Sequence, residues 1–268
     1  MNVSISKERE LFLSNLKKHK ARILFTQIFI VFSFLILWEL LAKFEIINPF
    51  ITSQPSRIAS TIADFQSNDL LLHIGITCLE TIVGFTLGSI IGTLIAFLLW
   101  WSKFTSDVAE PFLIILHALP KVALGPIIIV WAGAGTGAII VMALAISTIV
   151  TILEMLNGFN STDINLTKML TTFGASKWQI FKKIIFPSDV KTLINSMKVN
   201  IGLSLVGVIS GEFLVSKAGL GYLITYGGQV FKLDLVMTSV IILGILAGIM
   251  YGGVLLLEKF ILKTKKFK

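Results

Sequence analysis

The stretch TIVGFTLGSIIGTLIAFLLWWS at residues 81–102 contains no aspartate, glutamate, lysine or arginine. A helix that crosses a membrane needs about 20 consecutive apolar residues, so this stretch is long enough to cross on its own. Mostly apolar residues 70–79 lead into it, and Glu80 is the single aspartate, glutamate, lysine or arginine of the combined run. Residues 70–102 therefore predict a membrane-spanning helix.

The whole chain has the composition of an integral membrane protein. Of its 268 residues, 55% are hydrophobic and 14% are charged, and the mean hydropathy is +0.89. Soluble domains contain roughly 45–50% apolar and about 25% charged residues. A soluble enzyme, a disordered tail and a fibrous protein are thus excluded, and the length fits one compact bundle. The single cysteine, Cys78, excludes a disulfide framework within the chain.

Further apolar segments bring the expected number of spanning helices to six. Residues 122–153 carry no charge but contain several glycines and Pro126, so they are too long and too interrupted for one helix. We expect a turn at residues 131–137 between the third and fourth spans. An odd number of spans stays open because of this region. The other expected spans are residues 23–42, a span from about 108 that bends near Pro120, a span that ends near 153, residues 199–211 and residues 235–257.

Glycines at positions 84, 88 and 92 of the second span favour close packing against another helix over a sliding pore seam. The predicted fold class is therefore all-α and integral to the membrane, with six transmembrane helices and a large cytoplasmic loop between spans four and five.

The distribution of lysine and arginine sets the expected orientation. With the N-terminus in the cytoplasm, seventeen of the 23 basic residues lie in cytoplasmic segments and four in outer segments. Cytoplasmic loops of membrane proteins are enriched in these residues, so we expect a multi-pass protein of the cell membrane with both termini inside. The net charge of +8 then reflects loops beside anionic lipid, and we expect no nucleic-acid partner. The expected parts are a basic N-terminal segment (1–22), a transmembrane domain (23–258) and a basic tail (259–268).

The longest expected cytoplasmic loop, residues 157–191, contains an amphipathic helix. Its apolar residues at positions 166, 169, 170 and 173 have the i, i+3, i+4, i+7 spacing of one helix face. Asp163 is placed to cap the start of this helix, and Gly174 is placed to end it.

A second short helix is expected after Ser176, with Trp178, Phe181 and Ile184 on one side and Pro187 at its end. Two short amphipathic helices joined by a glycine either dock a partner protein or lie on lipid headgroups. The residues alone favour neither alternative.

The glycine-centred stretch FGAS at 173–176, followed by IIFP at 184–187, resembles the cytoplasmic "EAA" loop of permease subunits in binding-protein-dependent ABC importers of type I. Further segments, in matched order across residues 53–259, resemble the nitrate, sulfonate and taurine branch of this family. These segments are QPS at 54–56, GFTLG at 84–88, ALPK at 118–121, WAGAG at 131–135, GEF at 211–213 and GLGYLI at 219–224.

One position departs from the family pattern. The family's Glu-Ala-Ala falls on Lys168, Met169 and Leu170, which reverses the charge of its first residue. This departure puts in doubt an ion pair between that residue and the ATPase, and it leaves the apolar face intact. The resemblance assigns ATPase coupling to Lys168, Leu170, Phe173, Gly174, Ala175, Ser176, Trp178, Phe181, Ile184 and Pro187.

The resemblance also implies the partners. Two copies of this chain would form the pore as a homodimer in membrane lipid, two cytoplasmic ATPase subunits would dock on the loops, and an extracytoplasmic solute-binding protein would deliver the cargo. ATP and Mg²⁺ belong to the ATPase, and we expect no cofactor in this chain. The sequence has no G-x-x-x-x-G-K-[S/T] loop, and its three histidines are far apart, so we expect neither an enzyme nor a metal site.

Four residues are candidates for the translocation path: Glu80, Lys121, Trp131 and Glu212. An ionisable group at the depth of Glu80 is costly, so it faces a cavity or a partner, or else it reaches outer water. Lys121 either lines the path at the bend beside Pro120 or lies in a tight turn near the surface. For Glu212, a helix-end carboxylate at the outer interface is favoured over a binding role.

Two classes of function compete at this stage. An importer permease would carry a small organic anion such as a sulfonate, taurine or nitrate, or alternatively a thiamine-type pyrimidine precursor. Glu80 is an unusual lining residue for an anion, which leaves neutral or cationic cargo open. The second class, a self-contained secondary carrier, predicts paired intramembrane charges or an inverted repeat. We find few central charges and no convincing repeat, so the importer is favoured.

Overall fold

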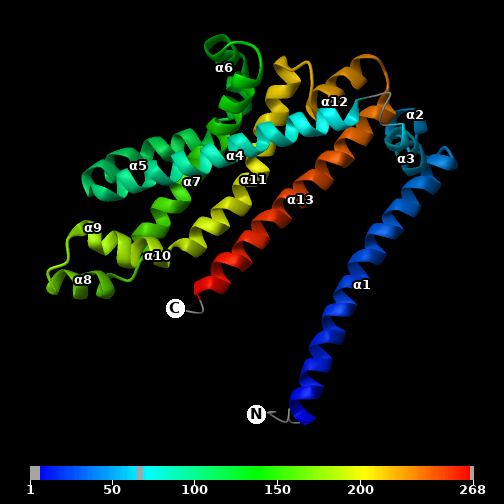
Figure 1. The fold of residues 1–268 in the computed structure, drawn as a ribbon. Coiled ribbons are helices and arrows are strands. Elements are labelled where there is room, and N and C mark those ends of the chain that lie inside the picture. The colour runs from blue at the N-terminus through cyan, green and yellow to red at the C-terminus, as the bar shows by residue number, and fades with distance from the viewer. Residues whose placement is uncertain (1–6, 65–68, 266–268) are drawn as a thin grey trace. The chain divides into compact units, whose positions relative to one another are not determined.

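The computed structural model describes residues 7–64 and 69–265, and every regular element within them is helical (Figure 1). Five helices of this part of the chain are long and apolar enough to cross a membrane, or six if one bent pair counts as a single span. The predicted all-α fold is thereby confirmed. The chain divides into two compact units, Met1–Ala63 and Asp64–Lys268.

The first unit contains α1 (Lys7–Lys43), α2 (Pro49–Thr52) and α3 (Pro55–Ala63). The helix α1 begins well before the expected span at 23–42, because no glycine or proline interrupts residues 7–43. Near its end, the Glu39 carboxylate accepts hydrogen bonds from the Ser56 amide (3.0 Å) and the Ser56 hydroxyl (2.8 Å). Glu39 thus satisfies a free amide in the first turn of α3. The first six residues of the expected N-terminal segment and the last three of the tail lie outside the described residues.

Three long helices form the centre of the second unit. Small residues bring them together: a Cβ added to Gly84 would lie 2.6 Å from the Ala143 Cβ, and one on Gly88 would clash with the Ser147 Oγ. A Cβ on Gly207 would lie 2.6 Å from the Ala143 Cα. Small residues allow such close approach between helices in membranes. The three helices are α4 (Leu70–Trp101), α7 (Thr136–Ser161) and α11 (Val190–Val215).

The expected third span is a bent pair. α5 (Lys103–Ala118) and the segment Lys121–Ala132, which comprises η1 (Lys121–Leu124) and α6 (Gly125–Ala132), meet at 86°. The bend near Pro120 is as predicted, but the first helix begins at Lys103 and not near 108. The turn before α7 is shorter than the expected 131–137, because α6 continues to Ala132 and α7 begins at Thr136.

The glycine-rich segment before the last span forms the helix α12 (Leu220–Gln229). It begins after Gly219, whose φ of +108° is a conformation that side-chain-bearing residues rarely adopt. The last helix, α13 (Leu233–Lys265), packs against α12 and α11.

The amphipathic segment between α7 and α11 contains α8 (Ile164–Thr172), α9 (Lys177–Ile180), the π-helical turn η2 (Phe181–Ile185) and α10 (Phe186–Ser188). We call residues 163–188 the loop segment. It lies at one end of the second unit and α12 lies at the other (Figure 1). Pro187 does not end the second helix as predicted, because it lies in the first turn of α10, where a missing amide costs nothing.

Candidate functional site

The start and end of α8 are fixed by local hydrogen bonds. The Asp163 carboxylate accepts from the Asn165 amide at 2.8 Å, which confirms the predicted cap. At the other end the Gly174 amide donates to the Thr171 carbonyl (2.9 Å) and the Ala175 amide donates to the Leu170 carbonyl (3.0 Å). This paired closure requires a left-handed residue, and Gly174 has a φ of +76°. The direction in which the chain leaves α8 therefore depends on glycine at position 174.

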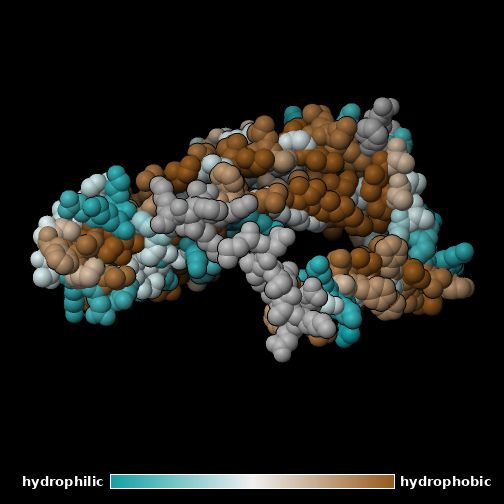
Figure 2. Space-filling view, turned by 60° about the horizontal axis from the view of Figure 1, so that its bottom comes forward, coloured by the Kyte–Doolittle hydropathy of each residue, from teal (hydrophilic) through white to brown (hydrophobic). Residues whose placement is uncertain are grey.

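Most of the apolar face of α8 is uncovered within the chain. Phe173 is 79% exposed, Met169 48% and Leu166 43%. Leu170 alone among the four predicted face residues packs against the buried cluster at this end of the bundle. Lys168 is exposed beside them. In Figure 2 the end of the molecule that contains α8 and α9 combines hydrophilic residues with a smaller hydrophobic area, whereas the sides of the long helices are mainly hydrophobic.

The second helix of the loop segment begins at a reciprocal cap. The Ser176 hydroxyl accepts from the Gln179 amide (3.3 Å), and the Gln179 side chain accepts from the Ser176 amide (2.8 Å). Just after this cap, the Lys177 ammonium donates to the Trp101 carbonyl and lies 5.3 Å from the centre of the Trp100 ring. Lys177 thereby ties α9 to the end of α4.

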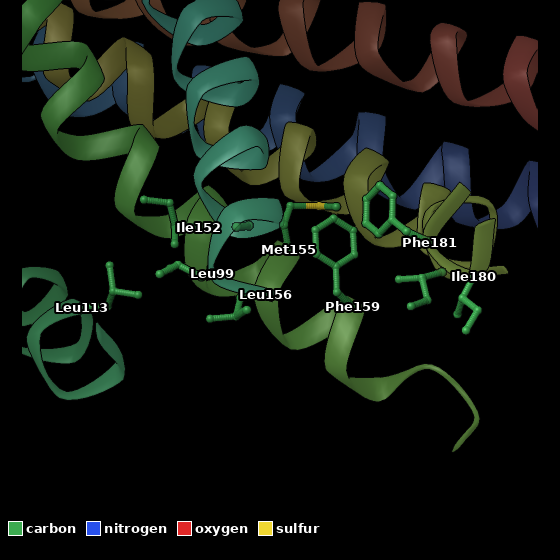
Figure 3. Close-up of a cluster of buried hydrophobic side chains, with 10 residues drawn as sticks. Leu99, Leu113, Ile152, Met155, Leu156, Phe159, Ile180 and Phe181 are labelled. Carbon is green, nitrogen blue, oxygen red and sulfur yellow. The ribbon is translucent and has the colours of Figure 1, made fainter. Parts of the chain in front are cut away.

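Phe181 joins the loop segment to the membrane helices. Its ring is 8% exposed and belongs to the cluster drawn in Figure 3, together with Phe159, Met155 and Leu99. Its centroid lies 5.4 Å from that of Phe159 on α7. Further ring centroids lie at 4.5 Å (Phe97), 5.2 Å (Trp100), 6.0 Å (Phe186) and 6.1 Å (Trp178). Phe181 therefore packs against α4 and α7 at once, while Trp178 remains 53% exposed.

The two ends of the loop segment are joined through Asp189. Its buried carboxyl group accepts hydrogen bonds from the hydroxyls of Thr162 (3.3 Å) and Thr192 (3.4 Å). Burial raises the pKa of Asp189 above its ordinary value, although both hydroxyls act in the opposite direction. The contact with Thr162 connects the end of α7 to the start of α11.

At the opposite end of the unit, Glu212 caps α12. Its carboxyl group accepts from the Thr77 hydroxyl (2.6 Å) and from the Gly221 amide (2.5 Å). The Thr77 oxygen accepts from the Leu220 amide, and His73 Nδ1 accepts from the Gly219 amide, both at 2.8 Å. These side chains accept hydrogen bonds from the backbone amides that have no partner within the helix at its N-terminus. Glu212 is 1% exposed, so it is buried under α12 and does not lie at an open interface.

Glu80 lies one turn along α4 from Thr77 and lines a cavity of about 760 Å³. Glu80 is 1% exposed, and its carboxyl group interacts with the Thr136 hydroxyl and the Glu212 carboxyl group. Its Oε2 has no hydrogen-bond partner among the described residues. The other lining residues come from the ends of the same three helices and their adjoining turns: Leu71, Leu72, Gly75, Ile76, Leu79, Ala134, Gly135, Thr136, Val215, Ser216, Lys217 and Ala218.

The other two candidates for the path lie away from this pair of carboxyl groups. Lys121 donates to the His117 carbonyl (3.0 Å) at the bend between α5 and α6. Trp131, near the end of α6, is 82% exposed. The structure therefore brings Glu80 and Glu212 together and places Lys121 and Trp131 on the bent pair.

Sequence reasoning missed three residues of this site, His73, Thr77 and Thr136. The first two precede Glu80 by seven and three positions, which puts all three on one face of α4. This polar spacing within an apolar run is a signal that was available. Thr136 could not be identified in this way, because it comes from another helix. The described residues contain no group of three or more His, Cys, Asp or Glu side chains placed to hold a metal ion.

Comparisons with known proteins concern the family and the fold of this chain. The family model described as "Binding-protein-dependent transport system inner membrane component" matches residues 84–261. The formylaminopyrimidine transport permease protein ThiX of Halalkalibacterium halodurans is 23% identical over 87% of this chain and 92% of its own length. The putative aliphatic sulfonates transport permease protein SsuC of Bacillus subtilis is 24% identical over 85% of this chain and 83% of its own length. Among solved structures, the MetNI methionine ABC transporter superposes with a TM-score of 0.63 at 18% identity, covering 69% of this chain and 92% of that one.

Proposed function

We propose that this chain, which belongs to the family of binding-protein-dependent transport system inner membrane components, couples its membrane helices to a separate ATPase through the loop segment. Family membership decides between the two classes of function, because it identifies the chain as the permease subunit of an ABC importer and not as a self-contained carrier. Its relatives are permease subunits and not enzymes.

The uncovered apolar face of α8 is the observation that carries this proposal. Phe173, Met169 and Leu166 are 43–79% exposed at the end of the bundle where the chain is most basic between its termini. An amphipathic helix that presents apolar residues in this way is typical of helix-in-groove docking. Lipid headgroups are the alternative covering, and they would bind the same face without stoichiometry or geometric specificity.

The packing of Phe181 gives the proposed docking a mechanical consequence. A displacement of α8 would be transmitted through the short turn at Gly174 to α9. From α9 it would reach α4 and α7 through the packed ring of Phe181. Close-packed interiors transmit such displacements because they compress little. An ATPase that closes on ATP and reopens after hydrolysis would thus bias the bundle between two arrangements.

The remaining assembly follows the family. We infer a homodimer of this chain in the cell membrane, with one ATPase subunit on each loop segment, both termini in the cytoplasm and a solute-binding protein on the outer face. Within the chain we propose a cytoplasmic segment at 1–22, the transmembrane domain at 23–258 and a cytoplasmic tail at 259–268. ATP and Mg²⁺ would be bound by the ATPase subunits.

The cargo is proposed as a chemical class and not as a single compound. The relatives are named for formylaminopyrimidine and for aliphatic sulfonates, so the importer machinery of this family serves chemically different cargo. A small organic anion such as a sulfonate, taurine or nitrate remains the first proposal, and a thiamine-type pyrimidine precursor remains the second. Screening the solute-binding protein that assembles with this chain for bound ligands would separate them.

The test of docking is capture of stoichiometric partners by the tagged chain in mild detergent. We expect a soluble ATPase in a one-to-one ratio with the permease. Phe173→Ser should reduce that ratio severalfold, because it removes the most exposed side chain of the α8 face. Phe104→Ser is the matched control, since Phe104 on α5 is 78% exposed, almost the same as Phe173 at 79%.

Capture by Phe173→Ser at the wild-type ratio would refute docking on α8. Equal loss in both would assign the capture to nonspecific apolar surface. A homo-oligomer without any ATPase, under conditions that preserve other importers, would refute the coupling proposal altogether.

A further inference from the structure

The cavity beside Glu80 combines a buried acidic group with apolar walls. The side chains of Leu71, Leu72 and Leu79 line it, and Glu80 is fully buried at its wall. A buried carboxyl oxygen without a hydrogen-bond partner is costly and marks a place where a further group can bind. Glu80 Oε2 is such an atom among the described residues.

The neighbouring groups do not supply the missing partner. Thr136 and Glu212 interact with the Glu80 carboxyl group. When Glu80 and Glu212 share a single proton in a hydrogen bond, the two carboxyl groups together still carry one negative charge. The Glu212 oxygens are already engaged by Thr77 and the Gly221 amide. Lys217 is the other ionisable residue that lines the cavity, and it lies at an exposed position in the turn after α11.

We propose that this cavity binds a small ligand through a cationic nitrogen group, such as an ammonium or a guanidinium, whose N–H donates to Glu80 Oε2. The apolar walls would contact the rest of the ligand, as is usual for small-molecule pockets. A cavity of about 760 Å³ is large enough for such a molecule. This inference rests on the proposed function in one respect, since the ligand would be cargo on its way through the importer. Of the cargo proposed above, taurine has an ammonium group and fits the cavity. Nitrate and sulfonates without an amine do not fit, because Glu80 would repel them, so this inference narrows the first cargo proposal.

The chemical test uses dicyclohexylcarbodiimide, which adds to protonated carboxyl groups in apolar surroundings. A cation that binds the ionised Glu80 competes with the proton that this reaction needs. The full chain in detergent is treated with the reagent, and the adduct at Glu80 is measured by mass spectrometry. Methylguanidinium chloride is the probe and methylurea, of the same shape without the charge, is its control, both at constant ionic strength.

We expect methylguanidinium to slow the reaction at Glu80 about threefold at twice its dissociation constant, and methylurea to have no effect. Glu154 on α7 provides an internal control, because it also has a buried carboxyl oxygen without a partner but does not line the cavity. Its reaction should be the same with and without methylguanidinium.

A pair of variants tests the cavity itself. Gly75 lines the cavity and a Cβ there would meet nothing within 4 Å, so Gly75→Leu should fill it without disturbing the helix. Protection of Glu80 by methylguanidinium should be lost. Gly202→Leu is the control, because Gly202 on α11 is also exposed and open but lies outside the cavity.

Several outcomes would overturn the inference: no adduct at Glu80, equal protection by methylurea and methylguanidinium, no protection by either, or protection that survives Gly75→Leu. Absence of protection is also the result expected if Lys217 already neutralises Glu80. The experiment uses the permease without an ATPase, so its failure leaves the coupling proposal standing, whereas failure of ATPase capture leaves this binding result standing.

Discussion

Replacing Phe181 by alanine should release the loop segment from the membrane helices without unfolding them. Substituting a buried phenylalanine by alanine costs about 3–5 kcal/mol in soluble proteins. Phe181 is 8% exposed and lies within 6.1 Å of five other aromatic rings, measured between centroids. Because the cluster lies at the end of the bundle and its neighbours can relax, we take about 3 kcal/mol, the low end of that range. This free energy shifts the equilibrium between the packed and released loop segment by about 140-fold.

Hydrogen exchange of the backbone amides measures this equilibrium directly. In Phe181→Ala, amides of residues 181–186 should exchange about 140-fold faster, while those in the middle of α11 should keep their wild-type rates. Phe186→Ala is the matched control. Phe186 is 39% exposed and its ring pairs with Phe181 at 6.0 Å, so about 1 kcal/mol and an acceleration of about fivefold are expected.

The functional consequence is uncoupling. In reconstituted vesicles, Phe181→Ala should retain the bound ATPase but import less cargo per ATP hydrolysed. Unchanged exchange together with unchanged coupling would refute the reasoning, because it would show that the ring cluster does not connect the loop segment to α4 and α7.

Four further predictions concern the loop segment, Asp189 and the ion pair between α11 and α13. Gly174→Pro should abolish transport but leave membrane insertion intact, because a proline cannot adopt the φ of +76° found there; normal ATP-driven uptake would contradict this. Lys168→Glu should leave ATPase capture unchanged, since Lys168 is exposed at the edge of an apolar face, and loss of capture would reveal a specific polar contact. The pKa of Asp189 is raised in the folded state above its ordinary value of 3.8, so the folded state binds more protons and its stability falls as the pH rises through that raised pKa; Asp189→Asn should remove this fall, as measured by thermal unfolding at pH 4 and pH 7. Lys198 and Glu258 form an ion pair of 2.8 Å between α11 and α13, so Lys198→Glu and Glu258→Lys should each lower the unfolding temperature in detergent and the double exchange should restore it, whereas additive losses would argue against the pair.

The parts of this fold that could be predicted from the sequence are those that depend on local patterns. The uncharged run at 81–102 predicts a spanning helix because the bilayer fixes its length and excludes charges, and α4 confirms it. The spacing of residues 166, 169, 170 and 173, together with Asp163 and Gly174, predicts α8 within a residue of its observed bounds. In each case the residues that predict the helix lie in that helix or directly at its ends.

The parts that could not be predicted depend on residues far apart in the chain. α12 contains three glycines in ten residues, which by helix propensity argues for a connector. The helix forms because Glu212 and Thr77, from two other helices, accept its first amides. Phe181 was expected on an apolar face of the loop segment, but its partners Phe97 and Phe159 come from α4 and α7, and no local spacing indicates them.

The two ends of the second unit are connected by packing that has little room to deform. Along α4 and α7 the glycines meet Ala143 and Ser147 so closely that a single methyl group would clash, and Gly207 of α11 meets the backbone at Ala143. Flexible side chains, which could absorb a displacement, are therefore absent from these contacts. A shift of the loop segment that moves Phe181 should accordingly move α4, α7 and α11 as one body. The cavity beside Glu80 is built from the far ends of these same three helices, so we expect a shift of the loop segment to displace the cavity while its lining residues keep their positions relative to one another.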